Sequence, residues 1–341
     1  MDKAQGSRAG RYWIGFDLGG TKMLACVYDA AFKCVGMERQ KSRAGDGVAV
    51  GIRRMADTIE AALERSGVSL RQVAGIGFGV PGPLDLEKGL VIQMPNLGWE
   101  AVPLQKKMED RFGCRVVLAN DVDAGTYGEY RFGAGRGARA LLGVFPGTGI
   151  GGAFIREGRL LTGARTTCME IGHIRVVSQG PRCGCGRVGC LETVASRLAI
   201  ASQAAIAVHR GEAPHLARLA GTDLAELRSG ALQKAVRQGD KAIEFIVREA
   251  ARRLGSAIAS LINLLGPDVV VLGGGLTEAF PAIFREECRK TAEEEVMRTF
   301  RGTYRIETAL LGDDATARGA AALAATPEAL GRAEERRERK P

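Results

Sequence analysis

Short apolar runs separated by polar and glycine-rich turns set the pattern at the start of the chain. The run YWIGF at 12–16 predicts a buried strand that leads into DLGGTK, and the stretch MLACVYDAAFKCVGMERQ predicts two more strands. Apolar residues then recur at helical spacing in VAVGIRRMADTIEAALERSG, which predicts a helix ending at Gly67. A continuous apolar run, VAGIGFGV, predicts the next buried strand. This order of elements predicts an α/β domain with a mixed sheet.

The same pattern begins again in the middle of the chain, which indicates an internal duplication. After the buried strand CRVVLAND, the stretch ARALLGVFPGTGIGGAFIREGRLLTG predicts a strand, a glycine-rich turn and a second strand. Helical spacing follows over 191–211 and 231–265, and PDVVVLGGGL predicts a strand that runs into another glycine turn. A last helix is predicted to begin near Asp313 or Asp314, either of which suits an N-cap.

Chain length and composition limit the kind of protein. A chain of 341 residues exceeds the size of an ordinary single core, so we expect two domains, with a boundary and a cleft between Asp121 and Gly135. No apolar stretch reaches the roughly 20 residues that span a bilayer, and the polar N-terminus lacks a secretion signal. We therefore expect no membrane contact and a cytoplasmic location. Part of the net charge of +9 lies in the mixed-charge tail GRAEERRERKP, so nucleic-acid binding is not expected.

Three glycine-rich turns each follow an apolar strand: DLGGTK at 17–22, GTGIGG at 147–152 and GGG at 273–275. Bare backbone N–H groups at the end of a strand cradle phosphate, because no Cβ blocks the approach. No stretch has the order of a Walker A loop, and GTGIGG precedes a predicted strand instead of the helix that a dinucleotide fingerprint requires. A hairpin turn that merely favours glycine is the alternative for any one of them. Three such turns together favour phosphate binding.

Asn120 and Asp121 come directly after the apolar strand VVLA, and Asp123 follows closely. The carboxyl ends of strands are where open α/β folds bind ligands. A carboxylate at this place can accept the proton of a substrate hydroxyl that attacks a phosphoryl group. A plain strand-end turn explains Asn-Asp equally well.

Three cysteines, Cys183, Cys185 and Cys190, lie within eight residues, and His173 lies ten residues before the first of them. One imidazole and three thiolates are the Cys₃His set of a closed tetrahedral zinc site, which holds structure without activating water. Disulfides are not expected in a cytosolic chain, and a redox pair needs a C-x-x-C motif that is absent here.

Glu170 and Glu192 bracket the predicted metal cluster. Surface carboxylates are usually only solvated. Two acids that a metal loop holds rigidly can instead bind sugar hydroxyls through charge-assisted hydrogen bonds.

Taken together, these motifs resemble those of the ROK family of sugar kinases and repressors, within the actin-like ATPase superfamily. The resemblance covers about residues 12–325 and is most specific where E-x-G-H is combined with C-x-C-G-x-x-G-C-x-E. The matching stretches, in family order, are DLGGTK, GVPGPLD, MPNLGW, NDVDA, GTGIGG, EIGHIRV, CGCGRVGCLE, VVVLGGGL and GDDATARGAA.

The resemblance implies an α/β fold of two actin-like (ribonuclease H-like) domains with mixed β-sheets flanked by helices, and with nucleotide and sugar in the interdomain cleft. We expect the chain to divide into a disordered N-terminus over 1–11, a small domain over 12–122, a larger domain over 123–312 with its zinc loop at 173–190, a C-terminal helix over 313–330 that packs on the first domain, and a charged tail over 331–341. It also implies a homodimer or a homotetramer.

The resemblance further implies an ATP-dependent hexose kinase, with glucose and its 6-hydroxyl as the first expectation, that uses Mg²⁺ and a structural Zn²⁺. Asp121 is the implied catalytic base. The implied sugar-binding residues are Asn96, Asn120, Glu170, His173 and Glu192, with His173 giving one ring nitrogen to zinc and the other to sugar. The implied nucleotide-binding residues are Asp17, Gly19, Gly20, Thr21, Lys22, Gly147, Thr148, Gly149, Gly273, Gly274 and Gly275, with Asp17 near Mg²⁺.

Two departures from the family pattern border the implied sugar pocket. Cys168 and Met169 stand where many of these kinases have Ala-Gly, and Asp123 stands where they often have Asn. Fructose, mannose, allose or an N-acetylhexosamine therefore stay open as substrates, and polyphosphate stays open as the donor. A sugar-sensing repressor of the family is disfavoured, because about eleven residues before the first strand leave no room for a helix-turn-helix domain. A non-catalytic sensor is disfavoured because Asp121 and the first glycine turn are both present.

Overall fold

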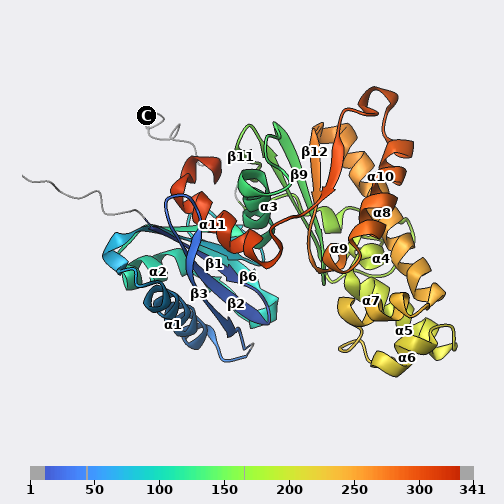
Figure 1. Ribbon diagram of the computed structural model, residues 1–341, viewed down its shortest axis with the longest axis horizontal. Coiled ribbons are helices and arrows are strands. Elements are labelled where there is room, and N and C mark those ends of the chain that lie inside the picture. The colour runs from blue at the N-terminus through green and yellow to red at the C-terminus, as the bar shows by residue number, and fades with distance from the viewer. Residues whose placement is uncertain (1–11, 44, 165, 331–341) are drawn as a thin grey trace, which may run out of the picture. The chain divides into compact units, whose positions relative to one another are not determined.

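A computed structural model of the chain describes residues 12–43, 45–164 and 166–330, which divide into two compact units (Figure 1). Within the described ranges, the first unit contains 12–136, 155–168 and 313–330, and the second contains 137–154 and 169–312. The predicted N-terminal segment 1–11 and the charged tail 331–341 lie outside the described residues.

The first unit is built on a five-stranded mixed sheet with the order β3-β2-β1-β4-β8. Its strands are β1 (Tyr12–Leu18), β2 (Lys22–Tyr28), β3 (Cys34–Lys41), β4 (Val73–Val80) and β8 (Val116–Asn120). Strands β1, β4 and β8 are parallel, whereas β2 and β3 are antiparallel to their neighbours. The predicted strands at the start of the chain are thus confirmed. Because parallel strands end at one edge, the ends of β1 and β8 lie on the same side of the unit as the end of β4.

Helices cover both faces of this sheet (Figure 1). Helices α1 (Val48–Ser66) and α2 (Leu104–Phe112) bury apolar side chains such as Met55 and Met108 against one face. Helix α1 ends at Gly67 in the left-handed conformation, as the sequence predicts. Helices α3 (Asp121–Phe132) and α11 (Ala315–Ala325) lie on the other face. A small antiparallel sheet of β5 (Leu84–Asp85), β6 (Leu90–Met94) and β7 (Trp99–Val102) completes the unit.

Helix α11 packs directly on backbone because glycines face it. A Cβ added to Gly15 of β1 would lie 1.8 Å from the carbonyl oxygen of Ala317, and one added to Gly77 of β4 would lie 1.9 Å from that of Ala320. A Cβ on Gly319 of α11 itself would lie 1.8 Å from the carbonyl oxygen of Ala124 in α3. No side chain fits at these contacts, so the segment that precedes α11 is held firmly over the sheet.

A second five-stranded sheet, whose three parallel strands belong to the second unit, has the order β11-β10-β9-β12-β13, which repeats the order of the first sheet. Its strands are β9 (Ala140–Pro146), β10 (Ile150–Arg156), β11 (Arg159–Leu160), β12 (Val269–Leu272) and β13 (Arg305–Thr308). The parallel trio here is β9, β12 and β13. The repeated strand order is what the sequence pattern of an internal duplication predicts.

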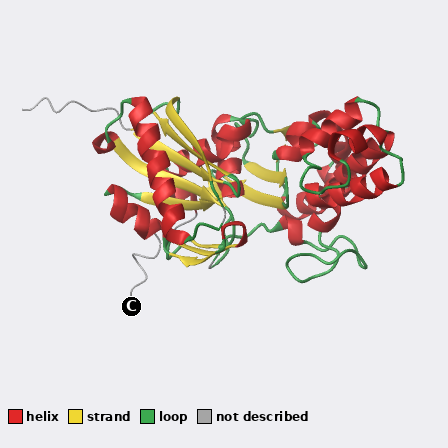
Figure 2. Cartoon of the chain, turned by 90° about the horizontal axis from the view of Figure 1, so that it is seen from below, coloured by secondary structure: helices red, strands yellow, loops and turns green. Residues whose placement is uncertain are grey.

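Most of the second unit is helical (Figure 2). Its helices are α4 (Glu192–Ala195), α5 (Arg197–His209), α6 (Pro214–Ala220), α7 (Ser229–Arg237), α8 (Lys241–Leu265), α9 (Gly275–Ala279) and α10 (Pro281–Glu295). The helical patterns predicted over 191–211 and 231–265 are confirmed, but each is divided into two helices. Extended Ser196 caps α5 and separates it from α4, and Gly239 at φ 107° separates α7 from α8. Among the described residues, no helix is long and apolar enough to cross a membrane.

The division of the chain differs from the predicted boundary at 122/123. Helix α3 begins at Asp121 but packs on β4 and α11, so residues up to 136 stay with the first unit. Residues 155–168 also belong to that unit, since β11 lies against the 3₁₀ helix η6 (Pro327–Leu330). The sequence predicts that the helix over 313–330 packs on the first domain, but it does not predict that 155–168 belong to the first unit.

Candidate functional site

The first glycine turn, between β1 and β2, is fixed by hydrogen bonds and brings in Asn96. The backbone N–H of Gly19 donates to the carbonyl oxygen of Lys22 at 2.9 Å, and the Ser42 hydroxyl donates to the carbonyl oxygen of Gly19 at 2.5 Å. A Cβ added to Gly20 would lie 3.4 Å from Asn96 Nδ2. The structure therefore places Asn96, from a distant motif, beside the glycine turn that the sequence assigns to phosphate. Ser42 was not found from the sequence.

Lys22 of this turn is paired with an acid from the far end of the chain. Its Nζ lies 2.9 Å from Asp313 Oδ1, and Arg39 Nη1 lies 3.1 Å from Asp313 Oδ2. The hydrogen bond from Lys22 lowers the pKa of Asp313 below its ordinary value. Asp314 stands at the N-cap position of α11 but makes no capping hydrogen bond; it accepts the Tyr28 hydroxyl at 2.5 Å. The predicted capping role is thus wrong, because both acids instead bind strands of the first sheet.

Asp17 and Asp121 lie at one edge of the first sheet. Asp17 pairs with Gly79 across β1 and β4, and a Cβ on Gly79 would lie 3.6 Å from the Cα of Asp121. Burial, and next the negative charge of Asp121, raise the pKa of Asp17 to about 7. Two carboxylates in this position repel each other, and a divalent cation between them would relieve that repulsion. Their chemistry fits the predicted Mg²⁺.

Asn120 and Asp121 begin helix α3. The Asn120 side-chain oxygen accepts the backbone N–H groups of Val122 at 2.9 Å and Asp123 at 3.4 Å, so Asn120 caps the helix. Its side-chain amide is left as the group that can donate to a ligand. Asp123 is buried within α3, whereas Asp121 is only partly buried. The predicted strand-end turn is therefore present, with Asn120 as the helix cap, and Asp121 follows it at the carboxyl end of β8.

Asp17 offers a test of this electrostatic arrangement. With a folded pKa of about 7 against an ordinary value of 3.8, Asp17 binds a proton in the folded state that it loses on unfolding. The stability that protonated Asp17 gives is present below about pH 4 and is lost as the pH rises to about 7. We expect Asp17→Asn to raise the free energy of unfolding by about 1–4 kcal/mol at pH 8 and by little at pH 4.

Urea unfolding of the metal-free protein at both pH values measures this difference. Asp57→Asn, at an exposed position of α1, is the matched control and is expected to show no such dependence. An equal effect of Asp17→Asn at both pH values would contradict the raised pKa.

The second glycine turn, between β9 and β10, lies against the carboxylate of Glu192, the first residue of α4. Gly147 donates its N–H to the carbonyl oxygen of Gly149 at 2.8 Å, and Glu192 Oε2 accepts the N–H of Ile150 at 3.2 Å. A Cβ on Gly149 would lie 2.4 Å from Glu192 Oε2. Glu192, predicted to bind sugar, thus packs against the turn predicted to bind phosphate.

The third glycine turn lies beside the second. Strands β9 and β12 are parallel neighbours, and Gly273 donates its N–H to the carbonyl oxygen of Val144 at 3.0 Å. A Cβ on Gly274 would lie 2.8 Å from the carbonyl oxygen of Pro146. The two turns therefore present bare backbone at one edge of the second sheet.

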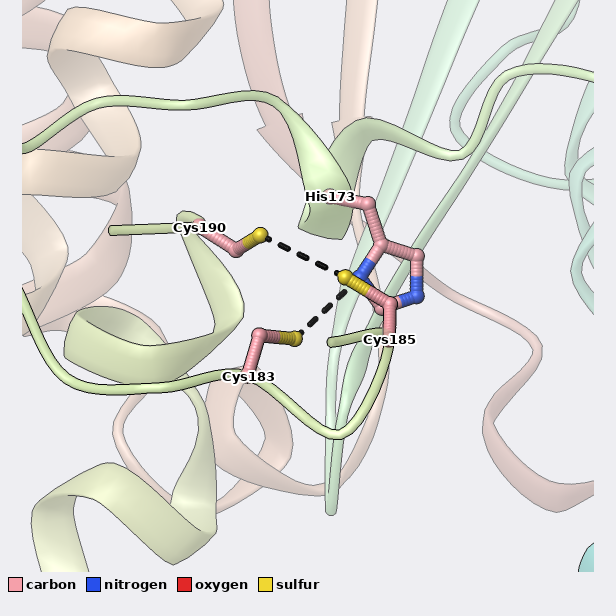
Figure 3. A group of neighbouring side chains, drawn as sticks. All are labelled: His173, Cys183, Cys185 and Cys190. Carbon is pink, nitrogen blue, oxygen red and sulfur yellow. Dashed lines mark hydrogen bonds between the residues drawn. The ribbon is translucent and has the colours of Figure 1, made fainter. Parts of the chain in front are cut away.

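The predicted metal ligands converge (Figure 3). The ligand atoms of His173, Cys183, Cys185 and Cys190 all lie within 4.8 Å of one another. Cys183 Sγ lies 3.5 Å from His173 Nδ1, and Cys185 Sγ lies 3.7 Å from Cys190 Sγ. A zinc tetrahedron with Zn–S bonds of about 2.3 Å and Zn–N bonds of about 2.0 Å has S···S edges of about 3.8 Å and S···N edges of about 3.5 Å. The donor set and its spacing fit zinc.

The loop that carries these cysteines is closed on itself. Leu191 donates its N–H to the carbonyl oxygen of Ile174 at 2.9 Å, and Gly189, at φ 77°, lies so close to the Val177 carbonyl that a Cβ would come within 1.8 Å of it. Arg187 donates to the carbonyl oxygen of His173 at 2.6 Å. Hydrogen bonds from Arg187 also lower the pKa of the Cys185 thiol. Arg187 is a supporting residue that the sequence did not single out.

The predicted site residues fall into two groups, one in each unit. The first unit holds Asp17, the first glycine turn, Asn96, Asn120 and Asp121, and the second unit holds the other two glycine turns, Glu192 and the metal cluster. Glu170 is exposed just before the 3₁₀ turn η3 (Ile171–His173), and its carbonyl oxygen accepts the N–H of His173 at 3.0 Å. Each group combines acids with bare glycine backbone, an arrangement that suits the binding of a phosphate and its metal ion.

Comparison with known proteins agrees with these motifs. Residues 13–326 match the ROK family. A glucokinase of Thermotoga maritima is 35% identical over 312 residues, which are 91% of this chain and 96% of that protein. The solved ROK family glucokinase of Streptomyces griseus, in complex with glucose and AMPPNP, is 32% identical with a TM-score of 0.81, and the match covers 92% of this chain and 99% of that one.

The family also contains regulators. A xylose repressor of Caldicellulosiruptor bescii is 28% identical over 310 residues, which are 91% of this chain and 77% of that repressor. The matches to both kinds of relative extend over 91% of this chain. On the extent of these matches, the chain belongs to the ROK family.

Proposed function

We propose that this chain is an ATP-dependent glucokinase, which transfers the γ-phosphoryl group of ATP to the 6-hydroxyl of glucose. The observation that carries the proposal is Asp121, a partly buried carboxylate at the start of α3 whose charge acts on Asp17; strand β4 lies between its strand β8 and the strand β1 that leads into the first glycine turn. Its support is the extended similarity to proteins named glucokinase, one of which was solved with glucose and an ATP analogue.

Asp121 is proposed as the general base. Phosphoryl transfer has a loose transition state, so the protein mainly positions the reactants and neutralises charge. Asp121 accepts the proton of the attacking hydroxyl from its place at the start of α3. Asp17 is proposed to hold Mg²⁺, which neutralises charge on the transferred phosphoryl group when bound. The glycine turns, with Thr21, Lys22 and Thr148, are proposed to bind the nucleotide.

Sugar recognition is proposed for five polar residues. Hydroxyl groups pair with carboxylates and amides through charge-assisted and ordinary hydrogen bonds, which fix the orientation of the ring. The proposed sugar-binding residues are Asn96, Asn120, Glu170, His173 and Glu192.

Zinc is proposed as a structural ion bound by His173, Cys183, Cys185 and Cys190. The support is the spacing of the four donor atoms, which matches a tetrahedron. When bound, the ion fills its four positions with protein ligands and supplies rigidity instead of an activated water. His173 turns Nδ1 toward Cys183 Sγ, so its Nε2 is the nitrogen proposed to meet the sugar.

The location and the assembly of the enzyme are part of the same proposal. We place the enzyme in the cytoplasm as a homodimer or a homotetramer, as the family resemblance implies. Size-exclusion chromatography with light scattering measures the assembly directly.

A coupled assay that follows ADP release tests the proposed reaction. Purified protein with Mg²⁺ is offered glucose, fructose, mannose, allose and N-acetylglucosamine, with ATP or inorganic polyphosphate as the donor. We expect the highest kcat/KM with glucose and ATP. A higher kcat/KM with another hexose would correct the substrate, and a lack of turnover on every sugar with either donor would refute the kinase proposal.

A further inference from the structure

Arg197 is tied to the second glycine turn by its backbone and by its side chain. It is the first residue of α5, and its N–H donates to the carbonyl oxygen of Gly147 at 2.9 Å. Its Nη2 donates to the hydroxyl oxygen of Thr148 at 3.1 Å. Thr148 is exposed, and the atom nearest to where a Cβ of Gly147 would lie is 4.0 Å away. A guanidinium group therefore stands beside an open stretch of bare backbone.

Arg228 brings a second guanidinium group to the same region. It stands at the N-cap position of α7, with its Nε donating to the carbonyl oxygen of Ala225 at 3.0 Å. The next residue, Ser229, has its hydroxyl oxygen 3.9 Å from where a Cβ of Gly275 would lie. The residue that follows Arg228 thus lies next to the third glycine turn. The pKa of Arg197 is lowered, mainly by burial and next by the positive charge of Arg228.

Arg197 and Arg228 bring two like charges to this region. Among the residues that the structure describes, no carboxylate forms an ion pair with Arg197 or Arg228. Two guanidinium groups in proximity raise the free energy of the folded state unless an anion joins them. Arginine is also the side chain best suited to bind phosphate oxygens in pairs.

The basic residue that the sequence analysis assigned to phosphate binding is Lys22, which belongs to the first unit and already forms an ion pair. Lys22 of the first glycine turn is paired with Asp313 at 2.9 Å. Its ammonium group is therefore partly neutralised before any ligand binds, which leaves a need for further positive charge opposite a phosphate chain carrying several negative charges.

We propose that Arg197 and Arg228, together with the second and third glycine turns, bind the phosphate chain of the phosphoryl donor. This inference rests on the proposed kinase function, and it assigns to the donor two basic residues that no recognised motif contains. The shared chemistry is a chain of at least two linked phosphate groups, which comes either from a nucleotide or from inorganic polyphosphate. Arg197 binds the chain from the second turn and Arg228 from the third.

Calorimetric titration of Arg197→Gln and Arg228→Gln tests the site with inorganic tripolyphosphate, AMPPNP, glucose and glucose 6-phosphate as separate ligands. We expect Arg197→Gln to weaken tripolyphosphate and AMPPNP about 10-fold, since it removes a charge-assisted contact, and to change the affinity for glucose less than about twofold. Arg197→Lys keeps the charge and is expected to recover part of the loss. In kinetics, the KM for the donor rises while the KM for glucose does not.

Arg237→Gln is the matched control, because Arg237 is exposed at the end of α7. It is expected to bind all four ligands like the parent protein. Unchanged melting temperatures show that the variants are folded. A loss confined to AMPPNP makes the donor a nucleotide, and an equal loss for tripolyphosphate shows that the phosphate chain alone is recognised.

Unchanged donor affinity in both glutamine variants would overturn the proposal, as would a loss for glucose 6-phosphate alone. A parent protein that binds tripolyphosphate in an arginine-dependent way but phosphorylates no sugar would refute the kinase function while leaving the phosphate site intact. A parent protein that binds neither phosphate ligand overturns the site itself.

Discussion

Asp121→Asn is expected to lower kcat by about 10² to 10⁴ and to leave the fold and the affinity for glucose nearly unchanged. The amide has almost the shape of the carboxylate, so Asn120 still caps α3 through Val122 and Asp123. The amide introduced at position 121 cannot accept the proton of the attacking hydroxyl. It also removes a negative charge beside Asp17, which lets the pKa of Asp17 fall from about 7. The measurement is steady-state kinetics with saturating ATP and glucose, together with calorimetric titration of glucose.

Asp110→Asn is the control for this substitution, because Asp110 is exposed on α2 and pairs with Lys106 one turn away. It is expected to keep full activity. A kcat for Asp121→Asn within about threefold of the parent value would remove Asp121 from the proton transfer.

Cys183→Ser is expected to abolish zinc binding and, with it, the order of the loop between Ile174 and Leu191. A serine hydroxyl is a poor zinc ligand at neutral pH, and a structural zinc site contributes folding free energy directly. Elemental analysis is expected to find about one zinc per chain in the parent protein and well under that in the variant. Because Glu192 touches both the second glycine turn and Cys183, we expect the KM for glucose to rise about 10-fold or more.

Cys114→Ser is the matched control, since Cys114 is partly buried in the first unit and outside the cluster. It is expected to keep zinc and activity. Treatment of the parent protein with a chelator is expected to reproduce the effect of Cys183→Ser. A metal-free preparation with full activity and an unchanged melting temperature would contradict a structural role for zinc.

Features with a local cause could be predicted from the sequence. The strands around the first two glycine turns follow from apolar runs, and the end of α1 at Gly67 follows from the freedom of glycine in the left-handed region. The metal cluster could be predicted because Cys183, Cys185 and Cys190 are close in sequence and His173 is near. In each case the pattern and the physical cause lie within a few residues of one another.

Features that depend on contacts between distant residues could not be predicted. Asp313 is 291 residues from Lys22, and Arg197 is 49 residues from Thr148. An aspartate before a helix and an arginine at a helix start are common surface choices, so nothing in their own sequence marks them. Asp314 shows the same limit, because it occupies an N-cap position but binds Tyr28 instead.

The interruptions of the long helical patterns were also missed, for a related reason. The apolar spacing continues across Ser196 and across Gly239, so the periodicity alone gives one helix where the backbone makes two. Gly239 and Asp240 are a turn signal, but the helical spacing on both sides of them is the stronger pattern and predicts a single helix.

The close packing of α11 on Gly15 and Gly77 has a consequence for synthesis on the ribosome. The first unit begins at the start of the described chain, but its closing helix is translated only after the whole of 169–312. At about 5–20 residues per second, one face of the sheet formed by β1 and β4 waits uncovered for many seconds while the second unit folds. The nascent protein must therefore keep that face away from other chains until α11 has been translated and can pack on it.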